Sequence, residues 1–194
     1  MAKRIITISR EFGSGGRFIG EEVAKKLGIA YYDKEMIGQI AEQAGLSSAY
    51  VRENAELSPK KGWFAYAFSG RDITGKSVED MVYEAQRKVI MEIAEKENCV
   101  IVGRNADFIL KDRKLNVFIH GSIPEKVRRI CSLYNVTEVD AIKMINDIDK
   151  RRRTNYNFYT EQKWGMAENY TMSLNSSVLG YDLCQKIIID CAKL

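Results

Sequence analysis

Short runs of β-branched and other apolar residues alternate along the chain with longer segments whose apolar residues recur at helical spacing. The short runs are too brief and too β-branched for buried helices, so we interpret them as strands, at residues 5–8, 29–32, 99–103 and 115–120. A helical pattern follows the first strand, with Ile19, Val23 and Leu27 on one side. The alternation predicts an α/β fold with a parallel sheet covered by helices on both faces.

Residues that begin and end helices support this division. Gly28 is placed to end the first helix, and Asp33 to cap the next. Ser122 with Glu125, and Thr137 with Asp140, have the spacing of capping boxes. The helix that starts after Thr137 runs into the sequence DKRRRT, and we expect the polar aromatic stretch 155–165, a strand-like segment and a C-terminal helix after it.

The middle of the chain is less regular. A short helix is predicted to begin at Ser47, and residues 57–76 show no clear periodicity, which is typical of a loop. A long helix is predicted from Ser77, with its end near Asn98.

Composition limits the classes of protein that fit. The 194 residues are 45% hydrophobic, with only two prolines, so we expect one domain over residues 1–194. A formal charge of +4 is too small to indicate a long polyanion such as nucleic acid as the main partner. The four cysteines form no CxxC pair, which removes the usual zinc and redox patterns. No run approaches the ~18 apolar residues of a membrane span, and the N-terminus lacks a signal-peptide core, so we expect a cytoplasmic protein without a membrane partner.

The glycine-rich sequence REFGSGGR lies between the first strand and the first helix. Glycines let backbone N–H groups converge on an anion, and a helix N-terminus adds partial positive charge, so the segment predicts a phosphate site. A tight turn without a ligand is the alternative. The Walker pattern has a glycine where Arg10 stands and a lysine where Gly16 stands. Arg17, one position later, is our candidate for the missing cation.

Two more segments carry cations at element ends. Arg104 and Asn105 follow a buried strand, where the arginine can grip a phosphate and the amide can bond a base edge. A plain surface arginine is the competing interpretation. The run DKRRR, residues 149–153, is by itself typical of a solvated helix face. Beside a phosphate loop, an arginine-bearing lid explains it better.

These segments, in this order, resemble the nucleoside monophosphate kinases. GSGGR, YYDKE, VGRNAD and DIDKRRR are similar to the GSGKG, YLDTG, EGRDxG and RDxxR segments of the cytidylate kinases. SREFGSGGR, Trp164–Gly165, Asn169–Tyr170 and LNSS are similar to segments of the bacterial cytidylate kinase-like family, and the resemblance covers essentially the whole chain.

The resemblance implies a three-layer P-loop kinase fold that transfers the ATP γ-phosphoryl to a (deoxy)cytidylate-type nucleoside monophosphate, with Mg²⁺ accompanying ATP. It implies that one loop holds the ATP phosphates through Gly13, Ser14, Gly15, Gly16 and Arg17. The acceptor side would comprise Asp33, Arg104 and Asn105, with Asp33 near the acceptor phosphate or magnesium. Arg17, Arg152 and Arg153 would be the catalytic cations. Residues 38–76 would form the monophosphate-binding flap and residues about 148–168 the lid.

Departures from the pattern keep other functions open. The missing Walker lysine is compatible with a nucleotide-binding sensor or pseudo-kinase that turns over little. A nucleic-acid-binding module that uses Lys150–Arg153 is a third, less favoured hypothesis. The aromatic residues of 63–68 fit base stacking, packing that staples the loop, or a homodimer contact.

Overall fold

The computed structural model describes residues 4–43, 78–110 and 115–193. The predicted helix at Ser47, the loop 57–76, the aromatic residues of 63–68 and the predicted flap beyond residue 43 lie outside these ranges. The first six residues of that predicted flap, 38–43, belong to helix α2 (Lys34–Gln43).

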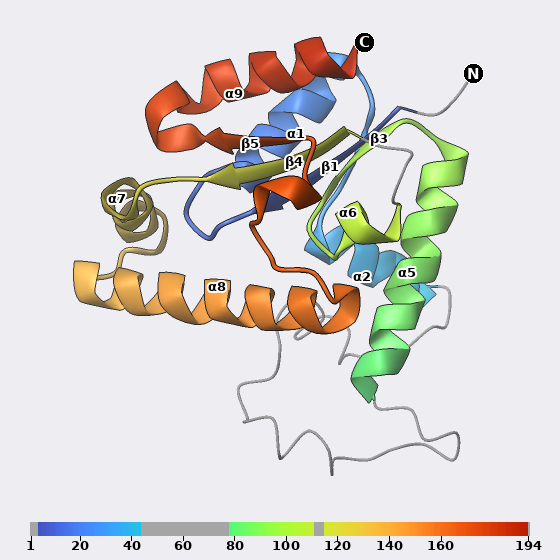
Figure 1. The fold of residues 1–194 in the computed structure, drawn as a ribbon, viewed down its shortest axis with the longest axis horizontal. Coiled ribbons are helices and arrows are strands. Elements are labelled where there is room, and N and C mark those ends of the chain that lie inside the picture. Colours follow the sequence, from blue (N-terminus) through green and yellow to red (C-terminus); the bar gives the residue numbers. More distant parts are fainter. Residues whose placement is uncertain (1–3, 44–77, 111–114, 194) are drawn as a thin grey trace.

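A parallel sheet forms the centre of the described part of the chain, with strand order β2-β3-β1-β4-β5 (Figure 1). The strands are β1 (Ile5–Arg10), β2 (Ala30–Tyr32), β3 (Cys99–Val102), β4 (Leu115–His120) and β5 (Met172–Asn175). Ile8 of β1 is in register with Val102 of β3 on one side and Val117 of β4 on the other. The carboxyl ends of these central strands therefore meet at one edge, where ligands bind in sheets of this kind.

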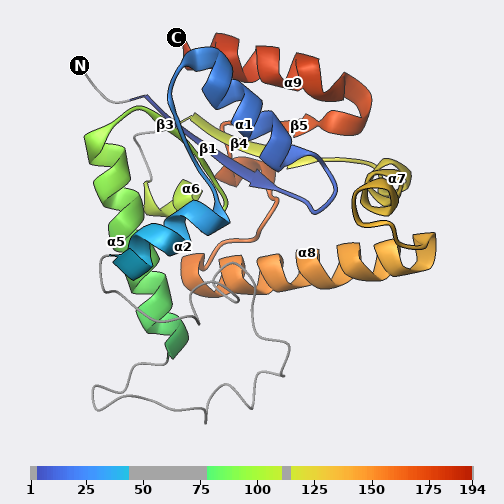
Figure 2. The ribbon, with the colours of Figure 1, turned by 180° about the vertical axis from the view of Figure 1, so that it is seen from behind.

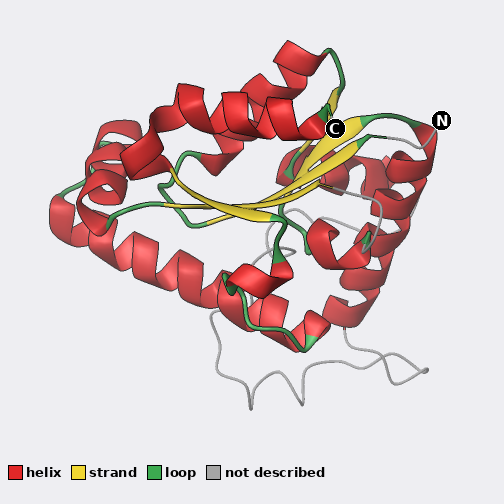
Figure 3. Ribbon diagram, turned by 45° about the horizontal axis from the view of Figure 1, so that its top comes forward, coloured by secondary structure: helices red, strands yellow, loops and turns green. Residues whose placement is uncertain are grey.

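Helices cover both faces of the sheet, as Figures 2 and 3 show. Helices α1 (Gly16–Leu27) and α9 (Ser176–Ala192) pack on one face through a cluster that includes Ile8 and Ile19. Helices α2, α5 (Val78–Lys96) and α6 (Ala106–Ile109) cover the other. The α/β architecture with helices on both faces is thus confirmed.

A smaller apolar cluster joins two further helices, α7 and α8. Val127 and Ile130 of α7 (Ile123–Tyr134) pack against Ala141 and Ile145 of α8 (Glu138–Thr160). Helix α8, which carries both predicted lid arginines, runs across the carboxyl edge of the sheet (Figure 1).

The helix boundaries agree in part with the sequence. Gly28 ends α1 in the left-handed conformation, with φ of 62°, and the Thr137 hydroxyl accepts a hydrogen bond from the Asp140 amide at 3.2 Å, as a cap does. The Ser122–Glu125 capping box is wrong: the Ser122 side chain makes no capping bond, and Glu125 instead pairs with Arg128 at 2.7 Å.

The polar aromatic stretch expected after DKRRRT is also helical in its first six residues, because α8 continues to Thr160. Tyr156 and Thr160 are buried there, so the stretch packs like the rest of the helix.

Candidate active site

The glycine-rich loop turns the chain from β1 into α1. Gly13 and Gly15 have φ of 83° and 81°, a left-handed conformation that favours glycine. The first amide groups of α1, from Gly16 onward, have no carbonyl partner within the helix, and they share the positive end of its dipole. The Ser14 hydroxyl donates to the Glu11 carbonyl at 2.8 Å, which holds the turn closed. The loop is therefore shaped for an anion through its backbone.

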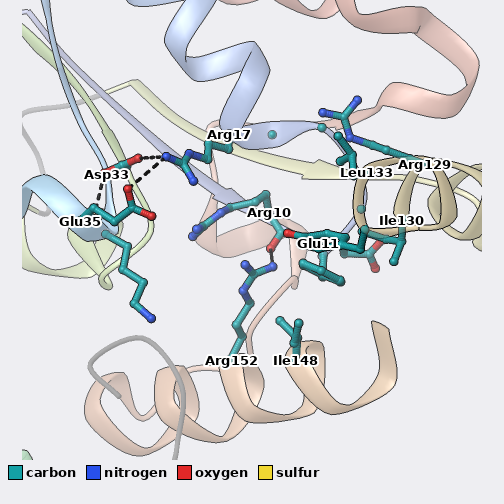
Figure 4. A pocket seen from close by; sticks show the side chains of 16 residues that line it. Arg10, Glu11, Arg17, Asp33, Glu35, Arg129, Ile130, Leu133, Ile148 and Arg152 are labelled. Carbon is teal, nitrogen blue, oxygen red and sulfur yellow. Dashed lines mark hydrogen bonds and ion pairs between the residues drawn. The ribbon is translucent and has the colours of Figure 1, made fainter. Parts of the chain in front are cut away.

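A cleft of about 550 Å³ opens at this loop (Figure 4). Its size is that of an ordinary small-molecule site. The cations among its described lining residues come from five different elements: Arg10, Arg17, Lys34, Arg129 and Arg152. The carboxylates are Glu11, Asp33 and Glu35. An excess of cations around a helix N-terminus is what a phosphate group requires.

Arg17 and Asp33 form an ion pair, although the sequence assigned Arg17 to the ATP phosphates and Asp33 to the acceptor side. Arg17 Nη2 lies 2.8 Å from Asp33 Oδ2 and 3.6 Å from a carboxylate oxygen of Glu35. The Asp33 Oδ1 atom accepts hydrogen bonds from the amides of Glu35 and Met36, so Asp33 caps α2 as predicted. Burial lowers the pKa of Arg17, but Asp33, Tyr31 and Glu35 outweigh this effect and raise the pKa above its ordinary value.

This arrangement bears on magnesium. Both carboxylate oxygens of Asp33 are engaged, by Arg17 and by the start of α2. Elsewhere in residues 4–43, 78–110 and 115–193 no group of three His, Cys, Asp or Glu side chains is placed to hold a metal ion. Asp33 in this conformation binds Arg17 and caps α2, and a magnesium role for it stays a prediction.

Arg104 and Asn105 lie in a strained turn at the end of β3. Gly103, Arg104 and Asn105 have consecutive positive φ values of 79°, 62° and 54°. Such strain in non-glycine residues clusters at functional sites. Arg104 is buried and donates to the Gln86 side chain at 3.4 Å and to the Lys34 carbonyl at 3.2 Å, which excludes the surface-arginine interpretation.

A second, much smaller pocket of about 20 Å³ adjoins this turn. Arg104 and Asn105 line it, together with Arg10 and Arg152, which also line the larger cleft. The Asn105 amide donates to Asn155 of α8 at 3.3 Å. The structure thus brings two of the three predicted acceptor-side residues, Arg104 and Asn105, next to the phosphate loop, and Asp33 lines the larger cleft.

The two predicted lid arginines lie in different places. Arg152 donates to the Arg10 carbonyl at 3.2 Å and pairs with Asp149 at 3.5 Å, at the border of both pockets. Arg153, the next residue on the helix, is exposed and lies over the Trp164 ring at 5.8 Å, outside the lining of both pockets. The structure therefore brings Arg152 to the cleft and does not bring Arg153 there.

Several site residues were missed from the sequence. Lys126 of α7 is buried beneath the loop, 2.9 Å from Glu11 and 3.6 Å from Asp149. Asp149 in turn accepts the Phe12 amide at 2.7 Å. Burial raises the pKa of Asp149, against the opposing effects of that amide, Arg152 and Lys126. No local pattern marks these contacts, because Glu11 and Phe12 lie more than a hundred residues from Lys126 and Asp149 along the chain.

Arg10 and Arg129 were missed for another reason. Arg10 occupies the place of the first Walker glycine, so the sequence marked it as a departure from the pattern and not as a candidate cation. Arg129 of α7 donates to the Tyr181 hydroxyl at 2.8 Å, and that ring packs against Gly15 of the loop.

Comparison with known proteins agrees with this geometry. Residues 5–178 match the cytidylate kinase-like family. The cytidylate kinase of Pyrococcus horikoshii is 24% identical over 155 residues, which are 79% of this chain and 70% of that protein.

Solved structures share the fold. An uncharacterized protein from Eubacterium ventriosum superposes with a TM-score of 0.76 at 28% identity, over 98% of this chain and 99% of that one. The shikimate kinase of Bacteroides thetaiotaomicron superposes with a TM-score of 0.55 at 16% identity, over 99% of each chain, a likeness that shows the fold alone. In the described part of this chain no helix has the length and apolar character needed to span a membrane.

Proposed function

The chain belongs to the cytidylate kinase-like family, and from this premise we propose that it transfers the γ-phosphoryl group of ATP to a nucleoside monophosphate of the (deoxy)cytidylate type. One observation carries the proposal: a glycine loop at a helix N-terminus opens into a cleft that five cations line, at the carboxyl edge of a parallel sheet. Phosphoryl transfer depends mainly on positioning and charge stabilisation, which such a cleft supplies.

The ATP phosphates are assigned to the glycine loop. We assign the phosphates to the residues of this loop, Gly13, Ser14, Gly15 and Gly16. The Ser14 amide donates to the Glu11 carbonyl at 3.4 Å, and the Ser14 carbonyl accepts a hydrogen bond from the Ser176 hydroxyl at 2.7 Å, so both bonds hold the loop in shape. ATP enters as its magnesium complex, and we assign no described carboxylate to the ion.

The acceptor is assigned to the turn after β3. Arg104, held by Gln86 and the Lys34 carbonyl, presents a planar guanidinium for the acceptor phosphate, and Asn105 faces the base. Asp33 holds Arg17 on the acceptor side of the cleft through their 2.8 Å ion pair.

The transfer forms one bond and breaks another. An oxygen of the acceptor phosphate bonds to the γ-phosphorus while the bond from that phosphorus to the β–γ bridging oxygen breaks, and ADP leaves. Arg152 stabilises the charge on the moving group, because it reaches the border of both pockets from α8. Closure of the residues around it excludes water.

The test is acceptor-dependent release of ADP, measured with CMP, dCMP, UMP and AMP in separate reactions. We expect turnover with the cytidine nucleotides above the rate with ATP alone. As a site control, Arg104→Gln raises the acceptor KM about tenfold or more and leaves the ATP Kd unchanged. Tight ATP binding without turnover on any of the four acceptors refutes the kinase and supports a nucleotide sensor, which the missing Walker lysine favours as second candidate.

A further inference from the structure

Gly16, where the Walker pattern has its lysine, stands directly against Arg10. A Cβ atom placed on Gly16 would lie 2.5 Å from the Cβ of Arg10 and 3.0 Å from its Cγ. Contacts this short do not occur between real side chains, and the Cβ of Arg10 cannot swing away as a side-chain tip can. Position 16 therefore accepts only glycine while residue 10 has a side chain.

The same contact explains both departures from the Walker pattern together. That pattern reads G-x-x-x-x-G-K, with glycine at the first position and the phosphate-binding lysine at the last. This chain has Arg10 at the first position and Gly16 at the last. Because the two positions touch, only one of them can carry a side chain, and here the cation stands on the strand instead of the helix.

Arg10 also has the location that the lysine would need. It continues the face of β1 on which Ile6 and Ile8 pack against α1, so its side chain leaves the sheet at the start of that helix. Its exposed fraction is 9%, and it lines both the phosphate-loop cleft and the small pocket beside Arg104. Figure 4 shows it in the space between Arg17 and Arg152.

Arg17 is placed differently. Its side chain is 59% exposed, and its guanidinium is held by Asp33 at 2.8 Å and by Glu35 at 3.6 Å, on the far side of the cleft from α7. Asp33 and Glu35 hold the Arg17 guanidinium at that side, and Arg10 lies where the two pockets meet.

We propose that Arg10 replaces the Walker lysine and contacts the β- and γ-phosphate oxygens of ATP, by an exchange of glycine and cation between positions 10 and 16. The proposal rests on the proposed function, since it names the group that binds the triphosphate in the same site. Arg17 then acts with Asp33 on the acceptor side.

The experiment measures the ATP Kd by titration calorimetry, without acceptor, for three variants: Arg10→Gly, Gly16→Lys and the double variant. Arg10→Gly is expected to weaken ATP binding about 10- to 100-fold, the effect of losing a charge-assisted contact. Gly16→Lys alone also weakens it, because the new side chain meets Arg10. The double variant, which restores the Walker spacing, is expected to recover binding to within a few-fold of the native protein.

Two controls keep the comparison sharp. Arg10→Ala removes the guanidinium but keeps the Cβ, so it separates loss of charge from any effect of glycine on the strand. Arg128→Gln removes an exposed arginine of α7 that forms an ion pair with Glu125 of the same helix and lies outside the lining of both pockets, and it is expected to leave the ATP Kd unchanged. Urea unfolding shows that each variant is folded.

Unchanged ATP affinity in folded Arg10→Gly and Arg10→Ala overturns the proposal, as does a folded double variant that binds no tighter than Arg10→Gly. Neither result touches the proposed function, which fails separately if native protein binds ATP but phosphorylates no acceptor.

Discussion

Replacing Lys126 by methionine tests whether the buried ion pairs beneath the phosphate loop hold it in place. Its side chain is 4% exposed, and its ammonium lies 2.9 Å from Glu11 and 3.6 Å from Asp149. Methionine keeps most of the volume and removes the charge. The variant therefore leaves two carboxylates facing each other under Gly13 without a lysine.

The size of the effect follows from the burial of the three groups. Removing one partner of a buried ion pair typically destabilises a protein by about 3–5 kcal/mol, because the remaining charge has lost its compensation. In the variant, Asp149, which is 11% exposed, still binds the Phe12 amide and Arg152, and Glu11 is 27% exposed. We therefore expect a loss of unfolding free energy at the lower end of this range, about 3 kcal/mol. For a chain of this length that corresponds to a fall in Tm of roughly 10 °C.

The pH dependence has a definite sign. Lys126 lowers the pKa of Asp149, which burial already raises, so its loss raises that pKa further. A carboxyl whose folded pKa lies above its unfolded value stabilises the protein at low pH, and this stabilisation is lost as the pH rises through the folded pKa. The deficit of Lys126→Met is therefore expected to be small below the ordinary pKa of aspartate, near 3.8, and to grow as the pH rises toward neutrality.

Urea unfolding at several pH values measures this, with Lys143→Met as the matched control. Lys143 is 73% exposed and pairs with Asp140 at 3.7 Å on the same helix, so its loss is expected to cost less than about 0.5 kcal/mol. Equal unfolding free energies for the two variants at pH 7, or a Lys126→Met deficit that shrinks as the pH rises, would refute the reasoning.

Three further results are expected. Arg152→Gln is expected to lower kcat, measured by ADP release, about 100-fold, whereas the kcat of Arg153→Gln is expected to stay within a few-fold of the native value. Equal losses of kcat in the two variants would contradict the assignment of Arg152 alone to the cleft. Gly20→Ala lowers unfolding free energy by about 1–3 kcal/mol in urea, because its Cβ would lie 2.9 Å from Val102, and a stabilised variant would show that α1 has room to move. Burial raises the pKa of the Cys99 thiol to about 12 and also raises that of Cys184. Ellman's reagent at pH 8 is therefore expected to modify only Cys131 and Cys191 before unfolding, and rapid modification of all four cysteines would contradict this burial.

The fold was predictable because its signals are local. The β-branched runs mark the central strands, and Gly28 and Asp33 mark helix ends through bonds within a few residues. The extension of α8 to Thr160 was not predictable in the same way. Its buried face changes from Ile145 to Asp149 and then Tyr156, and buried polar groups remove the apolar periodicity on which helix prediction depends.

The candidate site was predictable only as far as its loop sequence reaches. Glycines at 13, 15 and 16 indicate an anion site wherever the rest of the chain lies, because the conformation they allow is a property of the backbone. Which cation faces that site depends on contacts across the sheet edge. Sequence order made Arg17 the nearest substitute for lysine, whereas the fold turns Arg17 toward Asp33 and places Arg10 beside Gly16.

The contacts of α8 make the lid and the loop one unit, with a consequence for catalysis. Asp149 accepts the amide of Phe12 within the loop, and three residues later Arg152 donates to the carbonyl of Arg10. A ligand that shifts the loop is therefore expected to shift α8 with it, because the hydrogen bonds of Asp149 and Arg152 both end on the loop backbone. If the proposed function holds, Arg152 is therefore expected to lie beside the phosphate loop before any ligand binds. When ATP binds without an acceptor, the backbone amides of α8 are expected to gain as much protection from hydrogen exchange as those of α1. Protection confined to α1 would show that the loop and the lid are independent.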